Sequence, residues 1–86
     1  MFVTVTALLK RIDNHIFYMN VNMDMLEGKL DNPNNYSRGF ILGVVSRQCN
    51  ELHNLIDELK RISTNKRAIA KCEAKAQEVC KRFREV

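Results

Sequence analysis

The chain has no tryptophan, one proline and three glycines among its 86 residues. Because proline and glycine interrupt regular secondary structure, their scarcity favours long elements joined by few turns. Long apolar runs are also missing: the longest covers about six residues, from Phe40 to Val45, whereas a membrane-spanning helix needs about 20. We therefore expect no membrane-spanning segment, and a chain this short predicts a single domain over residues 1–86.

The N-terminus also lacks the features of a secretory signal. No basic residue precedes its first apolar stretch, and Lys10 and Arg11 end that stretch early. The chain has three cysteines, an odd number that does not suggest a disulfide framework. We therefore expect a cytoplasmic protein with reduced thiols.

Three apolar stripes with alternating steps of four and three residues run along the chain. The first contains Val5, Leu9, Ile12, Ile16, Met19, Met23, Leu26 and Leu30. The second contains Ile41, Val45, Leu52, Leu55, Leu59 and Ile62, with the polar Gln48 on the same track. The third contains Ile69, Cys72, Ala76, Val79, Phe83 and Val86. This spacing places each stripe on one face of a helix, at the a and d positions of a heptad, and predicts an all-α protein whose helices pack lengthwise.

We expect helices over about residues 4–30, 35–62 and 65–84. Thr4 or Thr6 is suited to cap the first helix. Segment 31–35, which contains Pro33, is the clearest turn, because proline disfavours helical geometry in the residue before it. The second helix is expected to begin near Asn35 or Ser37.

Two features leave alternatives open. Segment 63–65 contains neither proline nor glycine; if it forms a turn that Ser63 or Thr64 caps, the fold is a three-helix antiparallel bundle. If the helix continues, the fold is an extended helical hairpin with coiled-coil-like packing. Residues 1–6 and 17–25 also show the polar and apolar alternation of a strand, although the helical pattern covers a longer stretch.

Charge is unevenly distributed. Residues 1–59 have a net charge of −2, and residues 60–86 have a net charge of +6. Four basic residues are expected on one side of the third helix, opposite its stripe: Arg67, Lys71, Lys75 and Arg82. Such a face can bind phosphates, but it lacks interleaved aromatic residues that stack on bases. We treat a nucleic-acid-associated regulator as the alternative function.

Small and aromatic residues gather at the start of the second expected helix. Gly39 and Gly43 are four residues apart, beside Tyr36 and Phe40. Such a glycine pair lets another helix approach closely. That helix is either the first helix of the same chain, near the turn, or a partner or second copy that binds Tyr36, Gly39, Phe40 and Gly43.

The sequence contains no pattern typical of an enzyme. Cys49, His53, Cys72 and Cys80 would supply four zinc ligands, but their spacing is not that of a zinc finger, and Cys72 lies on an apolar stripe. Cys49 with His53 or His15 forms no recognisable nucleophile motif. Paired carboxylates and a phosphate-binding glycine loop are missing from the sequence. We therefore expect no enzymatic activity, no metal and no other cofactor.

The segment from Gly28 to Tyr36 resembles the turn of the small helical-hairpin co-chaperones of type III secretion needle subunits. The shared pattern is Gly-Lys-Leu, then Pro33, then Tyr36, over nine residues between two long amphipathic helices. This resemblance implies a cytosolic adaptor that pairs with another helical protein and has no catalytic residues. The compact, Asn-rich helical chain also resembles small phage-encoded regulators or inhibitors. We predict a non-enzymatic adaptor, chaperone or inhibitor that binds a protein partner, with homo-oligomers as a further possibility.

Overall fold

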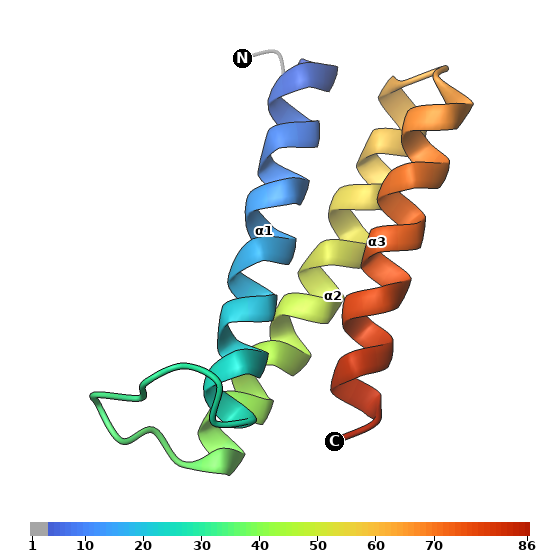
Figure 1. The fold of residues 1–86 in the computed structure, drawn as a ribbon. Coiled ribbons are helices and arrows are strands. Elements are labelled where there is room, and N and C mark those ends of the chain that lie inside the picture. The colour runs from blue at the N-terminus through green and yellow to red at the C-terminus, as the bar shows by residue number, and fades with distance from the viewer. Residues whose placement is uncertain (1–3) are drawn as a thin grey trace.

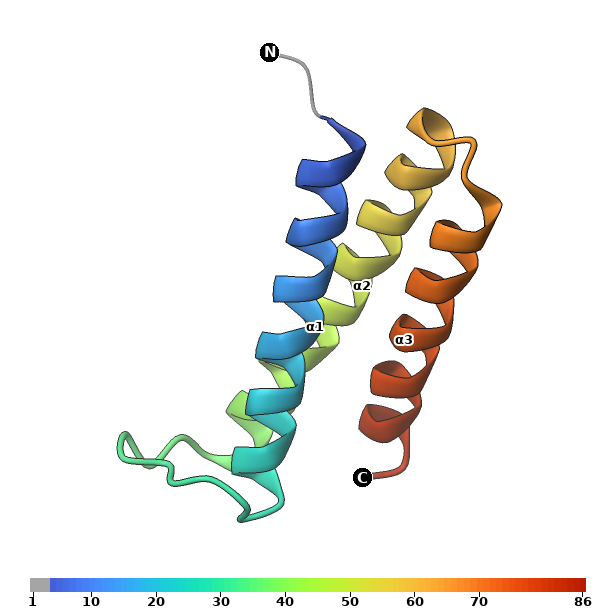
Figure 2. The same cartoon turned by 45° about the horizontal axis from the view of Figure 1, so that its top comes forward.

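The computed structural model describes residues 4–86 and has three helices in this range: α1 (Val5–Leu26), α2 (Arg38–Ile62) and α3 (Lys66–Arg84). The helices lie side by side, and α2 runs antiparallel to both α1 and α3 (Figure 1). Each helix contacts the other two, and the molecule measures 42 × 28 × 18 Å. The prediction of an all-α, three-helix bundle is confirmed. The break between α2 and α3 is plain in Figure 2, so the continuous-helix alternative is wrong.

The strand alternative is also wrong where the structure can test it. Residues 17–25 lie within α1, and residues 4–86 contain no strand. The other strand-like segment, residues 1–6, begins with three residues that lie outside the described part of the chain. The long apolar face that α1 buries outweighs the local alternation, because helix stability in proteins comes mainly from packing.

Each helix begins with a polar residue that caps it. Thr4, Ser37 and Asn65 are the N-caps, and each side-chain oxygen accepts a hydrogen bond of 3.1 Å from the backbone N–H three residues later. These bonds satisfy amide groups that have no partner within the helix. The expected role of Thr4 is confirmed, whereas α3 is capped by Asn65 and not by Ser63 or Thr64.

The first helix is shorter than expected: it ends at Leu26, not at residue 30. Gly28 adopts φ +78°, a left-handed conformation that terminates helices and that glycine adopts without strain. The N–H of Lys29 then folds back and donates to the carbonyl oxygen of Asp24 at 2.8 Å. Leu30 consequently leaves the stripe and is exposed.

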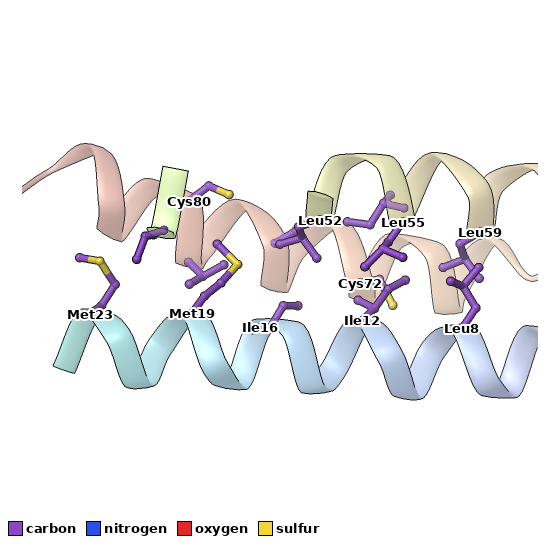
Figure 3. Close-up of a cluster of buried hydrophobic side chains, with 14 of the residues drawn as sticks. Leu8, Ile12, Ile16, Met19, Met23, Leu52, Leu55, Leu59, Cys72 and Cys80 are labelled. Carbon is purple, nitrogen blue, oxygen red and sulfur yellow. The ribbon is translucent and has the colours of Figure 1, made fainter. Parts of the chain in front are cut away.

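The apolar stripes supply most of the core. The fully buried side chains of α1 point toward α2 and α3 along the whole helix (Figure 3). Leu8 lies opposite Leu59 at one end, and Met23 lies toward the other end (Figure 3). The core consists of Leu8, Ile12, Ile16, Met19, Met23, Ile41, Val45, Leu52, Leu55, Ile56, Leu59, Cys72, Ala76, Val79 and Cys80.

The core departs from strict heptad positions at its ends and edges. Leu8 is buried in place of Leu9, which is only partly buried. Ile62 and Val86, the last members of their stripes, are exposed. An α-helix has 3.6 residues per turn, so a 3.5-residue stripe drifts by about 20° per heptad and leaves the buried face at the helix ends. Each helix also faces two neighbours, and the wider buried face takes in further residues, Ile56 and Cys80.

One polar group crosses the apolar interface of α1 and α2. The side-chain oxygen of Gln48 accepts a hydrogen bond of 3.1 Å from the Asn22 amide. The imidazole Nε2 of His15 lies 2.8 Å from the backbone carbonyl oxygen of Gln48. No fully buried side-chain nitrogen or oxygen among residues 4–86 lacks a partner. The polar residue on the second stripe is thus satisfied by residues of α1.

Substitutions at two adjacent leucines test which side of α1 is buried against the other helices. Leu8→Ala should lower the free energy of unfolding by about 2–5 kcal/mol, because it leaves a cavity at a site that is 1% exposed. Leu9→Ala should cost clearly less, because Leu9 is only partly buried. Urea unfolding of both variants measures the difference. A greater loss for Leu9→Ala would contradict the observed orientation of α1.

Candidate functional site: the exposed start of α2

Two aromatic side chains form an exposed stack where the loop enters α2. The rings of Tyr36 and Phe40 are stacked, with their centroids 4.8 Å apart and an interplanar angle of 22°. Tyr36 is 43% exposed and Phe40 is 51% exposed, so neither ring belongs to the core. The two side chains that the sequence predicted to bind a partner are therefore together on the surface.

The loop between α1 and α2 holds Tyr36 in place. The Asn32 side chain accepts a hydrogen bond from the Tyr36 N–H at 3.1 Å and donates to the Tyr36 carbonyl oxygen at 2.9 Å. The Asn34 amide donates to the Tyr36 hydroxyl at 3.2 Å. Asn35 has φ 50°, a left-handed conformation, so α2 cannot begin there and starts after the Ser37 cap. Asparagines thus fix the aromatic side chain at a defined position.

The two glycines beside the stack face open space. A Cβ atom placed on Gly39 or on Gly43 would meet no atom of another element within 4 Å in the described part of the chain. The expectation that they allow close packing against the first helix is therefore wrong. The alternative, that they belong to a contact surface for a partner or a second copy, stays a prediction.

The structure separates the four basic residues that the sequence predicted on one face of α3. Lys75 pairs with Asp13 of α1 at 3.5 Å. Arg82 is only 25% exposed and turns toward α1, where its guanidinium donates to Asp24 and to both carboxylate oxygens of Glu27. Two of the four residues of the predicted basic face, Lys75 and Arg82, therefore attach α3 to acidic residues of the α1 region.

The Arg82 cluster, defined as Arg82 with Asn20, Asp24 and Glu27, is the strongest electrostatic feature of the bundle. One guanidinium nitrogen also donates to the Asn20 side-chain oxygen at 3.1 Å. The Glu27 carboxylate accepts hydrogen bonds from Arg82 and from Lys29, and these bonds lower its pKa from 4.5 to about 2. The same carboxylates raise the pKa of Arg82, which stays charged. These contacts leave the guanidinium little capacity to bind an external phosphate.

Arg67 and Lys71 are the two residues of the predicted basic face that remain available. Both are exposed, and neither forms an ion pair with any residue among 4–86. Arg67 and Lys71, with the exposed Lys66 and Arg84 of the same helix, would make few phosphate contacts compared with a protein that makes about six to ten. The basic surface predicted for nucleic-acid binding is thus divided by ion pairs, whereas the aromatic residues predicted for partner binding are together.

The cysteines are divided between two places in the core. Cys72 lies near Ile12 and Leu55, whereas Cys80 lies toward the Met19 end of the bundle (Figure 3). Cys80 contacts Cys49 of α2, with the sulfur atoms 3.1 Å apart. The four-ligand zinc set considered from the sequence is therefore not assembled, and over residues 4–86 no three His, Cys, Asp or Glu side chains gather as metal ligands would.

Sequence reasoning missed a second exposed aromatic pair. Phe17 and Tyr18 of α1 are 62% and 60% exposed, and their rings meet edge to face with centroids 5.5 Å apart. Neighbouring residues on a helix point in different directions, so no periodic pattern singles them out. Unlike the Tyr36 hydroxyl, the Tyr18 hydroxyl forms no hydrogen bond with any residue among 4–86, and no glycine adjoins Phe17 or Tyr18 in the sequence.

Comparisons with known proteins identify no family for this chain. The chain matches no protein-family model, and searches of curated proteins and of solved structures also find no match. Within residues 4–86, no helix combines the length and the apolar character needed to cross a membrane.

Proposed function

We propose that this chain is a non-enzymatic adaptor, chaperone or inhibitor that binds a helix of another protein at the start of α2. The contact surface consists of Tyr36, Gly39, Phe40 and Gly43. The observation that carries the proposal is the stacked aromatic pair beside two glycines that face open space. Aromatic residues supply much of the binding energy at protein interfaces, usually within a small central cluster.

The position of the aromatic pair suits binding. Tyr36 is fixed through its backbone and its hydroxyl by Asn32 and Asn34. Phe40 is held by the first turn of α2 and by the stack itself. A surface that is already ordered loses little conformational freedom on binding, which favours affinity.

Packing among residues 4–86 does not require glycine at either position, because an added Cβ atom would meet no neighbouring element. Gly43 lies in the interior of α2, where glycine is less favourable than alanine by about 0.5–1 kcal/mol. An alanine methyl there would nevertheless contact no other part of residues 4–86 within 4 Å. A partner helix that approaches the backbone closely would give these glycines a function. Gly39 is exposed one turn earlier on the same face and extends that approach along one turn of α2.

The proposal is tested by capture of the partner from host lysate with tagged chain and with two variants. Phe40→Ala should weaken binding by about tenfold or more, because a central aromatic anchor contributes about 2 kcal/mol. Gly43→Leu should also block binding, although leucine is a better helix former than glycine and the variant should be at least as stable. Such a variant separates loss of binding from loss of folding.

Phe17→Ala is the matched control, because it removes an equally exposed aromatic ring from another part of the surface. It should leave capture unchanged. The lysate is used with and without nuclease, and the variants are also compared by analytical ultracentrifugation, since a second copy of the chain would be the simplest partner. Capture that depends on nucleic acid, or that is equally reduced by Phe17→Ala, would overturn the proposal.

A further inference from the structure

Two thiols from different helices meet at the edge of the core. The Cys80 thiol of α3 donates to the sulfur of Cys49 of α2, and the two sulfur atoms are 3.1 Å apart. A disulfide bond is about 2.05 Å long, so the atoms need to approach by about 1 Å to form one. The residues are 31 positions apart in the sequence, and therefore only the fold brings them together.

The surrounding helices fix this approach. Cys80 directly follows Val79, which is 2% exposed, and Cys49 lies between two fully buried residues of α2, Val45 and Leu52. The helix backbone that carries each cysteine is therefore held in place by core packing.

Solvent reaches the pair through a small groove. The groove has a volume of about 170 Å³ and is lined by both cysteines, with His53 and Arg84 among the residues around them. Cys49 is partly exposed, whereas Cys80 is 4% exposed. An oxidant from solution would therefore meet Cys49 first, and Cys80 is placed behind it as the second thiol.

We propose that Cys49 and Cys80 form an oxidisable dithiol, which a low-molecular-weight disulfide converts into a covalent bond between α2 and α3. The Cys49 thiolate attacks one sulfur of the small disulfide, whose S–S bond breaks, and a mixed disulfide and one free thiol form. The Cys80 thiolate then attacks the Cys49 sulfur and releases the second small thiol. Two protein thiols are oxidised, the small disulfide is reduced to two thiols, and the two protons pass to the leaving thiolates.

The environment sets the rate but does not prevent the reaction. Burial and the neighbouring Cys80 raise the pKa of the Cys49 thiol to about 12, which keeps the reactive thiolate scarce near neutral pH. Arg84 opposes this effect. We therefore expect slow oxidation, followed by a rapid second step because the attacking sulfur is already in contact.

The bond would close the α2–α3 hairpin around the short turn at residues 63–65. A cross-link between residues this far apart restricts the unfolded chain, so the midpoint of thermal unfolding should rise by about 10 °C or more. Cys72 offers an internal control: it is buried elsewhere in the core and should not react in the folded chain.

The test is to incubate the reduced 86-residue chain with oxidised glutathione and to follow intact mass, cross-linked peptides and thermal unfolding. We expect the loss of two hydrogen atoms, one cross-linked pair of peptides that contain Cys49 and Cys80, and the higher midpoint, all reversed by dithiothreitol. Cys72→Ala should behave like the parent chain. Cys49→Ser should give no intramolecular bond.

Peptide mapping of the parent chain decides the result even if a variant does not fold. A stable glutathione adduct on Cys49 without closure would overturn the proposal, because it would show that Cys80 cannot reach the mixed disulfide. Cross-links that involve Cys72, or a midpoint that does not rise after closure, would overturn it as well.

Discussion

The Leu52→Asp variant is expected to be unfolded at 25 °C. Leu52 is 0% exposed and lies in the middle of α2, among side chains from the other two helices. An aspartate there would bury a carboxylate without a partner and would remove a large apolar side chain, at a combined cost above about 4 kcal/mol. The whole stability of a chain of this length is about 4–13 kcal/mol. Far-UV circular dichroism and thermal unfolding measure the loss.

The matched control is Ile62→Asp. Ile62 belongs to the same predicted stripe and the same helix, but it is 41% exposed at the last position of α2. The substitution should cost no more than about 1 kcal/mol, mainly because an acidic residue is unfavourable at a helix C-terminus. If both variants remained folded with similar stability, the core assignment would be incorrect.

The second large effect should come from Arg82→Met. This substitution removes the charge and hydrogen bonds of the Arg82 cluster and leaves Asp24 and Glu27 close together without their cation. We expect a clear decrease in the free energy of unfolding near neutral pH, larger than for the exposed ion pairs of the bundle, since the Arg82 side chain is only 25% exposed and binds one carboxylate through two hydrogen bonds. Urea unfolding at pH 7 measures it.

The same variant should change how stability depends on pH. The Glu27 pKa is lowered in the folded chain, so its contribution is fully present above the ordinary pKa of 4.5 and is lost as the pH falls through about 2. Without Arg82, the pKa of Glu27 should return toward 4.5. The difference in unfolding free energy between the parent chain and Arg82→Met should therefore shrink between about pH 4.5 and pH 2.

Lys75→Met controls for the loss of one positive charge from α3. Lys75 also pairs with a carboxylate of α1, Asp13, but both side chains are about half exposed, at 45% and 58%. Exposed ion pairs contribute about 0–1 kcal/mol, so this variant should stay close to the parent chain. An equal loss for the two variants would show that net charge, and not the Arg82 cluster, is responsible.

The fold was largely predictable because its pattern is long and regular. The stripes indicate three helices, and the interior of each stripe is in the core. Their ends were predicted less well: Gly28 stops α1 through a backbone conformation that no hydrophobic period reports. The exchange of Leu8 for Leu9 likewise depends on how the helices turn against one another, which becomes definite only when all three are assembled.

The surface was harder to predict. Sequence spacing placed Tyr36 and Phe40 near each other, but whether the glycines face the bundle or the solvent depends on how α2 packs. The sequence predicted Arg82 on an open basic face. Its partners, Asp24 and Glu27, lie 55 or more positions earlier in the chain, at the end of α1, and local spacing does not indicate them. Long-range pairs such as this one, and the contact of Cys49 with Cys80, cannot be read from local periodicity.

The hydrogen bonds of Gln48 have a consequence for alignment. Apolar side chains are largely interchangeable, so α1 could slide along α2 by one turn, about 5.4 Å, and still bury a similar surface. After such a shift, the half-buried side chains of Asn22 and Gln48 would lose their hydrogen bond to each other, at a cost of about 0.5–1.5 kcal/mol. The Asn22–Gln48 hydrogen bond therefore favours the observed alignment of α1 with α2, together with the His15 bond to the Gln48 carbonyl and the Arg82 cluster between α1 and α3. Replacing Asn22 and Gln48 by leucine would remove one of these constraints.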